Sequence, residues 1–161
     1  MTAGHACADT KPLEAILARY PVEEPSLIPI LQDIQRAYAY LSCEALTRVA
    51  DALRVPIAQV FSVATFYRTF ALTPQGRTVV TVCTGTACHV RGANQLLDAL
   101  QRRLGIPAGE TTADLGFTLK TVNCVGACAM APLLIVGGRY HGNLKAARLP
   151  KILADGGADE D

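Results

Sequence analysis

Residues 78–92 read TVVTVCTGTACHVRG, and they place a β-branched run directly before two cysteines. Residues 78–82 are all valine or threonine, which is typical of a buried β-strand. The run ends on Cys83, and Cys88 follows after four further residues, so we expect both cysteines in the loop that leaves the strand. This stretch therefore predicts a sheet that carries a cysteine pair at the end of one strand.

A second cysteine pair lies further along the chain, in NCVGACAMAP at residues 123–132. Cys124 and Cys128 have three residues between them and follow residues 117–122, which read as a second strand. Loops at the same ends of neighbouring strands can bring four sulfur atoms together. The two pairs therefore predict one site, built from Cys83, Cys88, Cys124 and Cys128.

The other residues of this half alternate between helical and strand patterns. Residues 92–104 have the leucine spacing of an amphipathic helix. Residues 133–136 and 139–141 flank two glycines, which indicates a hairpin. Residues 145–154 predict a final helix. The order of one strand, a helix, three strands and a helix is that of an α/β layer.

The first half of the chain is helical in pattern throughout. Apolar residues recur at helical spacing over residues 13–17 and 27–38, Ser42 is placed to cap a third helix, and Pro56 to begin a fourth. We expect the fourth helix to bury Ile57, Val60, Phe61 and Ala64. These helices predict a small bundle.

The turn-forming residues 73–76 (TPQG) separate the two patterns. The sequence thus predicts a helical N-terminal domain over residues 1–74 and an α/β domain over residues 75–161.

Composition narrows the classes of function. The chain has 161 residues, of which 50% are hydrophobic, yet no run approaches the ~18 apolar residues of a membrane span, and no secretory signal begins it. We therefore expect a soluble, cytoplasmic protein with no direct membrane insertion. A net charge of +1 without an aromatic stacking platform argues against nucleic-acid binding. No glycine-rich nucleotide motif and no nucleophile arrangement occur, so no catalytic residues are predicted.

Cysteine spacing alone leaves two metal sites open. Disulfides are disfavoured in the cytoplasm, and four cysteines in two tight loops are unusual as inert thiols. Structural zinc sites use cysteine pairs at this spacing, and four thiolates also hold [2Fe–2S] clusters. Gly85 and Gly126 keep side chains small where a backbone approaches such an anion, and His89 and Arg91 add polar or cationic groups. We also expect the positive end of the helix that begins at Gly92 to face the site. A zinc ion with four thiolates and a [2Fe–2S] cluster with four thiolates are both anionic, so charge does not distinguish between them.

Both cysteine segments resemble one family. CTGTACHVRGA (83–93) and GETTADLGFTLKTVNCVGACAMAP (109–132), with the helical part before them, are similar to the small [2Fe–2S] subunit of the complex I flavoprotein module. The resemblance covers residues 10–153 and implies a thioredoxin-like ferredoxin domain behind the helical one. By matching positions, it implies that the four cysteines bind one [2Fe–2S] cluster.

The resemblance also implies a place in a complex. The family partner is an iron–sulfur flavoprotein that binds FMN and NAD(H), so the implied function is electron transfer within an NAD(P)H-linked oxidoreductase. The sequence of residues 83–92 resembles the subunits of hydrogenases, including electron-bifurcating ones, and of NAD-dependent formate dehydrogenases more than it resembles complex I members. A complex I (NADH:quinone oxidoreductase) subunit is the alternative. A second alternative is a zinc-stabilised adaptor protein without a redox role.

Several residues receive more detailed expectations. Because each cysteine pair occupies one loop, we expect the first pair on one iron and the second pair on the other. Cys7 and Cys43 fall outside the pattern and are expected to be free thiols. Arg91 is expected to stabilise the reduced cluster.

The helical half is expected to dock a partner. Its aromatic residues Phe66, Tyr67 and Phe70 are candidates for that contact.

Overall fold

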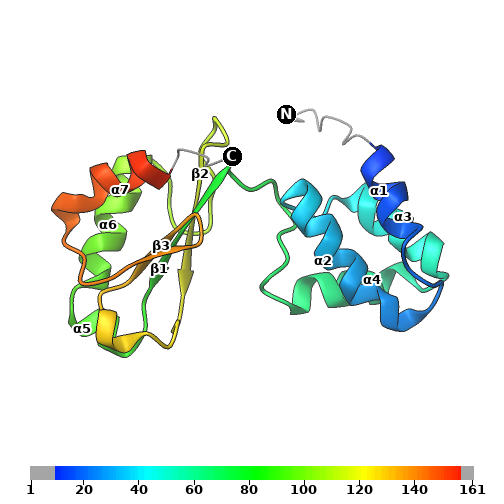
Figure 1. Ribbon diagram of the computed structural model, residues 1–161, viewed down its shortest axis with the longest axis horizontal. Coiled ribbons are helices and arrows are strands. Elements are labelled where there is room, and N and C mark those ends of the chain that lie inside the picture. The colour runs from blue at the N-terminus through cyan, green and yellow to red at the C-terminus, as the bar shows by residue number, and fades with distance from the viewer. Residues whose placement is uncertain (1–9, 157–161) are drawn as a thin grey trace. The chain divides into compact units, whose positions relative to one another are not determined.

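The computed structural model describes residues 10–156. They form two compact units, the first ending at Pro74 and the second beginning at Gln75 (Figure 1). None of the helices in this described part of the chain is long and apolar enough to cross a membrane.

The first unit is a bundle of four α-helices. They are α1 (Thr10–Leu17), α2 (Leu27–Tyr38), α3 (Cys43–Leu53) and α4 (Ile57–Phe66), with a 3₁₀ turn, η1 (Glu24–Ser26), before α2. The predicted cap of the third helix is confirmed, because the Ser42 hydroxyl oxygen accepts a hydrogen bond from the Ala45 N–H at 3.1 Å.

The bundle buries most of the predicted apolar residues, with one correction. Val60 and Ala64 of α4 are buried and Phe61 is partly buried, but Ile57 is 41% exposed. The expectation for Ile57 was wrong because α4 (IAQVFSVATF) is apolar on nearly all sides, so residue spacing does not select its buried face. Phe70, beyond the helix, belongs to the core of the bundle.

The second unit is built on a four-stranded sheet in the order β2-β1-β3-β4. The strands are β1 (Thr78–Cys83), β2 (Phe117–Val122), β3 (Leu134–Val136) and β4 (Arg139–His141). β1 and β2 run parallel, whereas β1 with β3 and β3 with β4 are antiparallel. The predicted hairpin around Gly137 and Gly138 is therefore confirmed, and so is the α/β fold class.

Helices cover one side of this sheet. α6 (Ala93–Leu104) and α7 (Leu149–Gly156) lie together there (Figure 1), and η3 (Ala146–Arg148) precedes α7. Leu96 and Leu100 of α6 are buried in one cluster with Val80, Val82 and Leu119 of the strands. This core holds the adjacent ends of β1 and β2 in place.

Two short helical segments follow the two parallel strands. α5 (Thr86–Val90) comes after β1, and the 3₁₀ turn η2 (Cys128–Met130) comes after β2. α5 lies where the sequence predicts a plain loop, and that expectation was wrong. A five-residue helix with two β-branched residues carries too weak a pattern to be recognised from sequence.

Candidate metal centre

Strand pairing brings the two cysteine segments to one edge of the sheet. β1 and β2 are parallel, and Cys83 at the end of β1 is paired with Val122 at the end of β2. Beyond the strands, the Thr84 N–H still donates to the Val122 carbonyl oxygen at 2.8 Å. The cysteines that follow each strand therefore start from neighbouring positions, as predicted.

The first cysteine segment is part of the regular structure. Cys83 is the last residue of β1 and Cys88 lies in α5, and their exposed fractions are only 4% and 3%. The chain turns between them at Gly85, whose carbonyl oxygen accepts the His89 N–H at 2.8 Å in α5. A strand and a helix thus hold this pair, and both cysteines pack in the core of the unit.

The second cysteine segment is an irregular turn at the surface. Cys124 and Cys128 are exposed, and Gly126 between them has a φ of 87°, in the left-handed region that favours glycine. This conformation directs the Gly126 N–H to the Cys124 sulfur at 3.3 Å. The Met130 carbonyl oxygen accepts the Asn143 N–H at 2.8 Å, which ties the end of η2 to the residues after β4.

The two segments touch at Gly85. A Cβ atom at this position would lie 2.6 Å from the Asn123 carbonyl oxygen and 3.4 Å from the Cys124 Cβ atom. Real Cβ atoms almost never approach a backbone atom so closely, so only glycine allows the two segments to lie this near to each other. Gly85 therefore sets the separation between the buried and the exposed cysteines.

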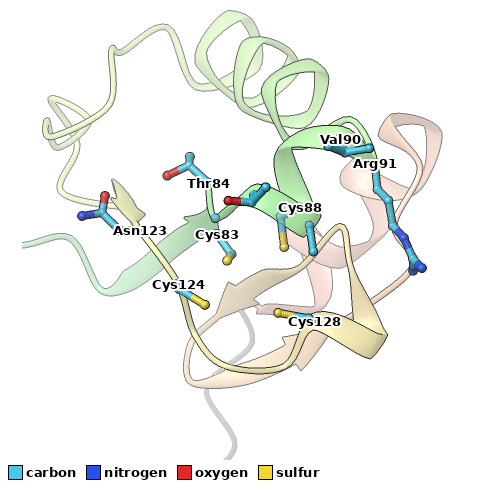
Figure 2. A pocket seen from close by; sticks show the side chains of 11 residues that line it. Cys83, Thr84, Cys88, Val90, Arg91, Asn123, Cys124 and Cys128 are labelled. Atoms are coloured by element: carbon cyan, nitrogen blue, oxygen red, sulfur yellow. The ribbon is translucent and has the colours of Figure 1, made fainter.

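All four cysteines line a single cavity of about 750 Å³. Figure 2 shows their sulfur atoms directed into one shared space, with Cys83 and Cys88 on one side and Cys124 and Cys128 on the other. Around them, the lining consists of Thr84, Gly85, Thr86, Ala87, Val90, Arg91 and Asn123. The structure thus brings together the four cysteines that the sequence analysis selected.

The surroundings of Cys83 favour its thiolate. Burial alone would raise the pKa of Cys83, but hydrogen bonds from the backbone N–H groups of Gly85 and Val125, and from the Cys88 thiol, outweigh it and lower the pKa. N–H groups from both segments thus converge on one sulfur.

The pKa of Cys88 is shifted in the opposite direction to that of Cys83. Its pKa is raised by burial, by its hydrogen bond with Cys83 and by the negative charges of Cys83 and Cys128, although the Leu133 N–H acts to lower it. The Cys83 and Cys128 sulfurs are therefore each close enough to repel a Cys88 thiolate. A bound cation or cationic cluster core would remove that repulsion.

These properties fit a thiolate-bound iron–sulfur cluster. Four sulfurs from two segments face one cavity, backbone N–H groups point at several of them, and Gly85 and Gly126 leave the backbone open to the site. Hydrogen bonds to sulfur and partial burial are the features by which proteins stabilise and tune such clusters. Within residues 10–156, no three histidine, cysteine or acidic side chains are placed to hold a single metal ion.

The two predicted polar neighbours take different places. His89 is exposed. The Arg91 guanidinium donates to the Ala131 carbonyl oxygen at 3.3 Å, and Figure 2 shows this side chain reaching away from the sulfurs. Arg91 therefore links α5 to the residues after η2. The helix predicted to begin at Gly92 is confirmed as α6, with Gly92 as its N-cap residue, and α5 lies between Gly92 and Cys83.

The two remaining cysteines do not belong to the set that lines the cavity. Cys43, at the start of α3 in the helical bundle, is an exposed free thiol as expected, and Cys7 is outside the described residues. The N–H groups of Val125 and Leu133 could not be found from the sequence, because backbone donors have no signature in residue type.

Comparison with known proteins gives consistent matches. The family described as thioredoxin-like [2Fe-2S] ferredoxin matches residues 13–156. Subunit HndA of the NADP-reducing hydrogenase of Solidesulfovibrio fructosivorans is 40% identical over 135 residues, which cover 84% of this chain and 79% of that protein. The E 2 subunit of the NADH-quinone oxidoreductase of Rhizobium meliloti (strain 1021) is 44% identical over 141 residues, covering 88% of this chain and 84% of that protein.

A solved structure is similar over almost the same length. The NAD⁺-reducing [NiFe]-hydrogenase in its H₂-reduced state contains a chain that is 26% identical, with a TM-score of 0.70 over 88% of this chain. The match covers 24% of that hydrogenase chain, so the present chain spans about a quarter of its length.

Proposed function

This chain belongs to the thioredoxin-like [2Fe–2S] ferredoxin family, and from that premise we propose that it transfers single electrons through one [2Fe–2S] cluster bound by Cys83, Cys88, Cys124 and Cys128. The observation that carries this proposal is the single cavity that all four cysteines line. When bound, the cluster supplies a one-electron store. In our proposal the buried pair binds one iron and the exposed pair binds the other.

The residues of the chain give each half of this site a separate task. The buried pair keeps water away from one side, since Cys83 and Cys88 are each less than 5% exposed. The exposed pair leaves the other side open to solvent or to a partner. Such an arrangement suits a centre that exchanges electrons with another protein and binds no substrate itself.

The electron donor or acceptor is proposed to be an iron–sulfur flavoprotein that binds FMN and NAD(H). Support comes from the names of the similar proteins, which belong to an NADP-reducing hydrogenase, an NADH-quinone oxidoreductase and an NAD⁺-reducing hydrogenase. This chain has no nucleotide-binding motif of its own. We also propose a cytoplasmic location.

Two larger assemblies are candidates. A hydrogenase is supported by the similarity to HndA and to the NAD⁺-reducing [NiFe]-hydrogenase, and it remains our first choice together with a formate dehydrogenase. A complex I assembly is supported by the 44% identity to the NADH-quinone oxidoreductase protein of Rhizobium meliloti. Purification of the native complex tests this choice, since a nickel–iron subunit, a formate-oxidising subunit or a quinone-reducing membrane part would copurify.

We further propose that residues 1–74 form a docking domain and that residues 75–161 form the cluster domain. Phe66 and Tyr67 support this, with exposed fractions of 78% and 43% at the end of α4. Phe70 does not support the docking proposal, because it is 9% exposed and its ring packs edge-on against Tyr67. Phe66→Ser should weaken binding to the copurified flavoprotein, while Val22→Ser, at another exposed apolar position of the bundle, should not.

The cluster itself is tested by anaerobic preparation of the full chain. Equal amounts of iron and acid-labile sulfide, matching one [2Fe–2S] cluster per chain, and a paramagnetic signal on one-electron reduction are expected. Serine at any of the four cysteines should remove or strongly perturb that signal, whereas Cys43→Ser should leave it unchanged. A colourless protein that contains zinc and no sulfide would instead identify a zinc-stabilised adaptor.

A further inference from the structure

Lys120 of β2 is a half-buried cation without a visible counter-charge. Within the part of the chain that the structure describes, no hydrogen bond or ion pair joins it to another residue. Burial alone lowers the pKa of Lys120, and no carboxylate acts on it in the opposite direction. Lysine is rarely withdrawn from water without a partner, so this position needs an explanation.

The face of the sheet on which Lys120 lies gives no such partner. Leu119 is paired with Val80 and faces the covered core, so Lys120 lies on the opposite face beside its register partner Thr81. Across the strands, the same row continues with Ile135 and then Tyr140, which is 56% exposed. This row contains no acidic residue, and a methionine or leucine would suit it at lower cost.

The same face leads to the proposed cluster. Side chains alternate along a strand, so Lys120 and Val122 share a face, and Val122 is the register partner of Cys83. From standard strand spacing and rise, the Cα atoms of Lys120 and Cys83 are about 8 Å apart. A half-buried lysine is screened less than an exposed one, so its charge can act on a charged group over such a range.

We propose that the negative charge that stabilises Lys120 is the thiolate-bound cluster itself, and that Lys120 in turn raises the reduction potential of that cluster. The inference rests on the function proposed above. Four thiolates and two bridging sulfides give the centre a net negative charge, which grows by one unit when an electron arrives. A nearby cation stabilises the reduced form more than the oxidised form. Lys120 is therefore an electrostatic residue that binds neither iron nor substrate.

The test uses the full, cluster-loaded chain and its midpoint potential by anaerobic redox titration. Lys120→Met removes the charge and keeps the length of the side chain, and we expect a more negative potential than in the wild type. Lys120→Arg should retain the wild-type potential. Lys145→Met is the matched control, since Lys145 is an exposed cation of the same unit, and we expect no shift.

Two further measurements separate an electrostatic role from a purely structural one: the salt dependence of the potential shift, and the melting temperature of the cluster-free variant. The shift in Lys120→Met should persist at high ionic strength, because a half-buried charge is only weakly screened. Without the cluster, the same variant should melt at or above the wild-type temperature, because it no longer buries an unpaired cation. Lys120→Gln provides a second neutral variant if methionine prevents folding.

Three outcomes overturn the inference: a wild-type potential in both neutral variants, an equal shift in Lys145→Met, or a wild-type potential with weaker binding of the flavoprotein. The third would assign Lys120 to a carboxylate of the partner. Failure of the wild-type chain to take up iron and sulfide would overturn the proposed function itself, and that result appears before any potential is compared.

Discussion

The two cysteine segments leave neighbouring parallel strands at the same edge of the sheet, yet they are built differently. The first places Cys83 and Cys88 in a strand and a helix, where each is nearly buried. The second places Cys124 and Cys128 in an exposed turn around a left-handed glycine. Four residues with one proposed chemical role therefore contribute differently to the stability of the fold. The first segment belongs to the core, and the second depends on what it binds.

Serine substitutions should separate these two contributions most strongly. Cys88→Ser and Cys128→Ser are both expected to lose the cluster, which is the largest effect we predict. In the cluster-free chain, Cys88→Ser should also lower the free energy of unfolding by about 1–3 kcal/mol, because it buries a polar hydroxyl where a thiol was accommodated. The exposed Cys128→Ser should change it by less than about 0.5 kcal/mol.

Denaturant unfolding of the cluster-free variants measures this difference, with Cys43→Ser as the control in the other unit. Equal destabilisation by the two serines would contradict the division into a structural and an exposed half.

Gly85 joins the two segments, and its substitution should affect both. In Gly85→Ala, the new methyl group would lie 2.6 Å from the Asn123 carbonyl oxygen, so the segments must move apart. We expect a loss of about 1–3 kcal/mol in the free energy of unfolding and a lower cluster content after reconstitution. Asn94→Ala, at an exposed position of α6 outside the cavity lining, should leave both close to wild type. Normal stability in Gly85→Ala would mean that the segments do not touch as closely as described.

Much of this arrangement could be predicted from the sequence, and the reasons are local. The strand at residues 78–83 is a β-branched run, the cap at Ser42 is a side-chain signal, and the two cysteine pairs have their own spacing. Each of these depends on residues that lie close together in the chain. The four candidate ligands could be selected for the same reason.

The features that escaped prediction depend on contacts between distant residues. Gly85 was recognised as small, but its contact with Asn123 joins positions far apart in the chain. The exposure of Ile57 and the burial of Phe70 depend on how α4 packs, which an almost uniformly apolar helix does not specify. The direction of Arg91 likewise depends on the carbonyl of Ala131, beyond the second cysteine pair.

The left-handed turn of the second segment offers a milder test. Gly126→Ala adds a methyl group that meets no atom within 4 Å, so its cost is only the backbone strain of a φ of 87°. We expect about 1–2 kcal/mol, with less for Gly126→Asn, because asparagine tolerates this conformation better. Unfolding of the cluster-free protein measures the difference. A cost as large as that of Gly85→Ala would show that the exposed segment is packed as tightly as the buried one.

Arg91→Ala should have a smaller effect than Gly126→Ala, and it also tests how the charge around the site sets the reduction potential. Its guanidinium bonds Ala131 at 3.3 Å, a long contact to an exposed side chain, so Arg91→Ala should cost less than about 1 kcal/mol in stability. The side chain reaches away from the sulfurs (Figure 2), so we expect the reduction potential to fall, but by less than in Lys120→Met. Redox titration of the two variants at the same ionic strength ranks the two cations. A larger fall of the reduction potential in Arg91→Ala than in Lys120→Met would reverse that ranking. It would mean that the guanidinium turns toward the cysteines when the cluster is bound. The first segment would then be the main source of positive charge at the site.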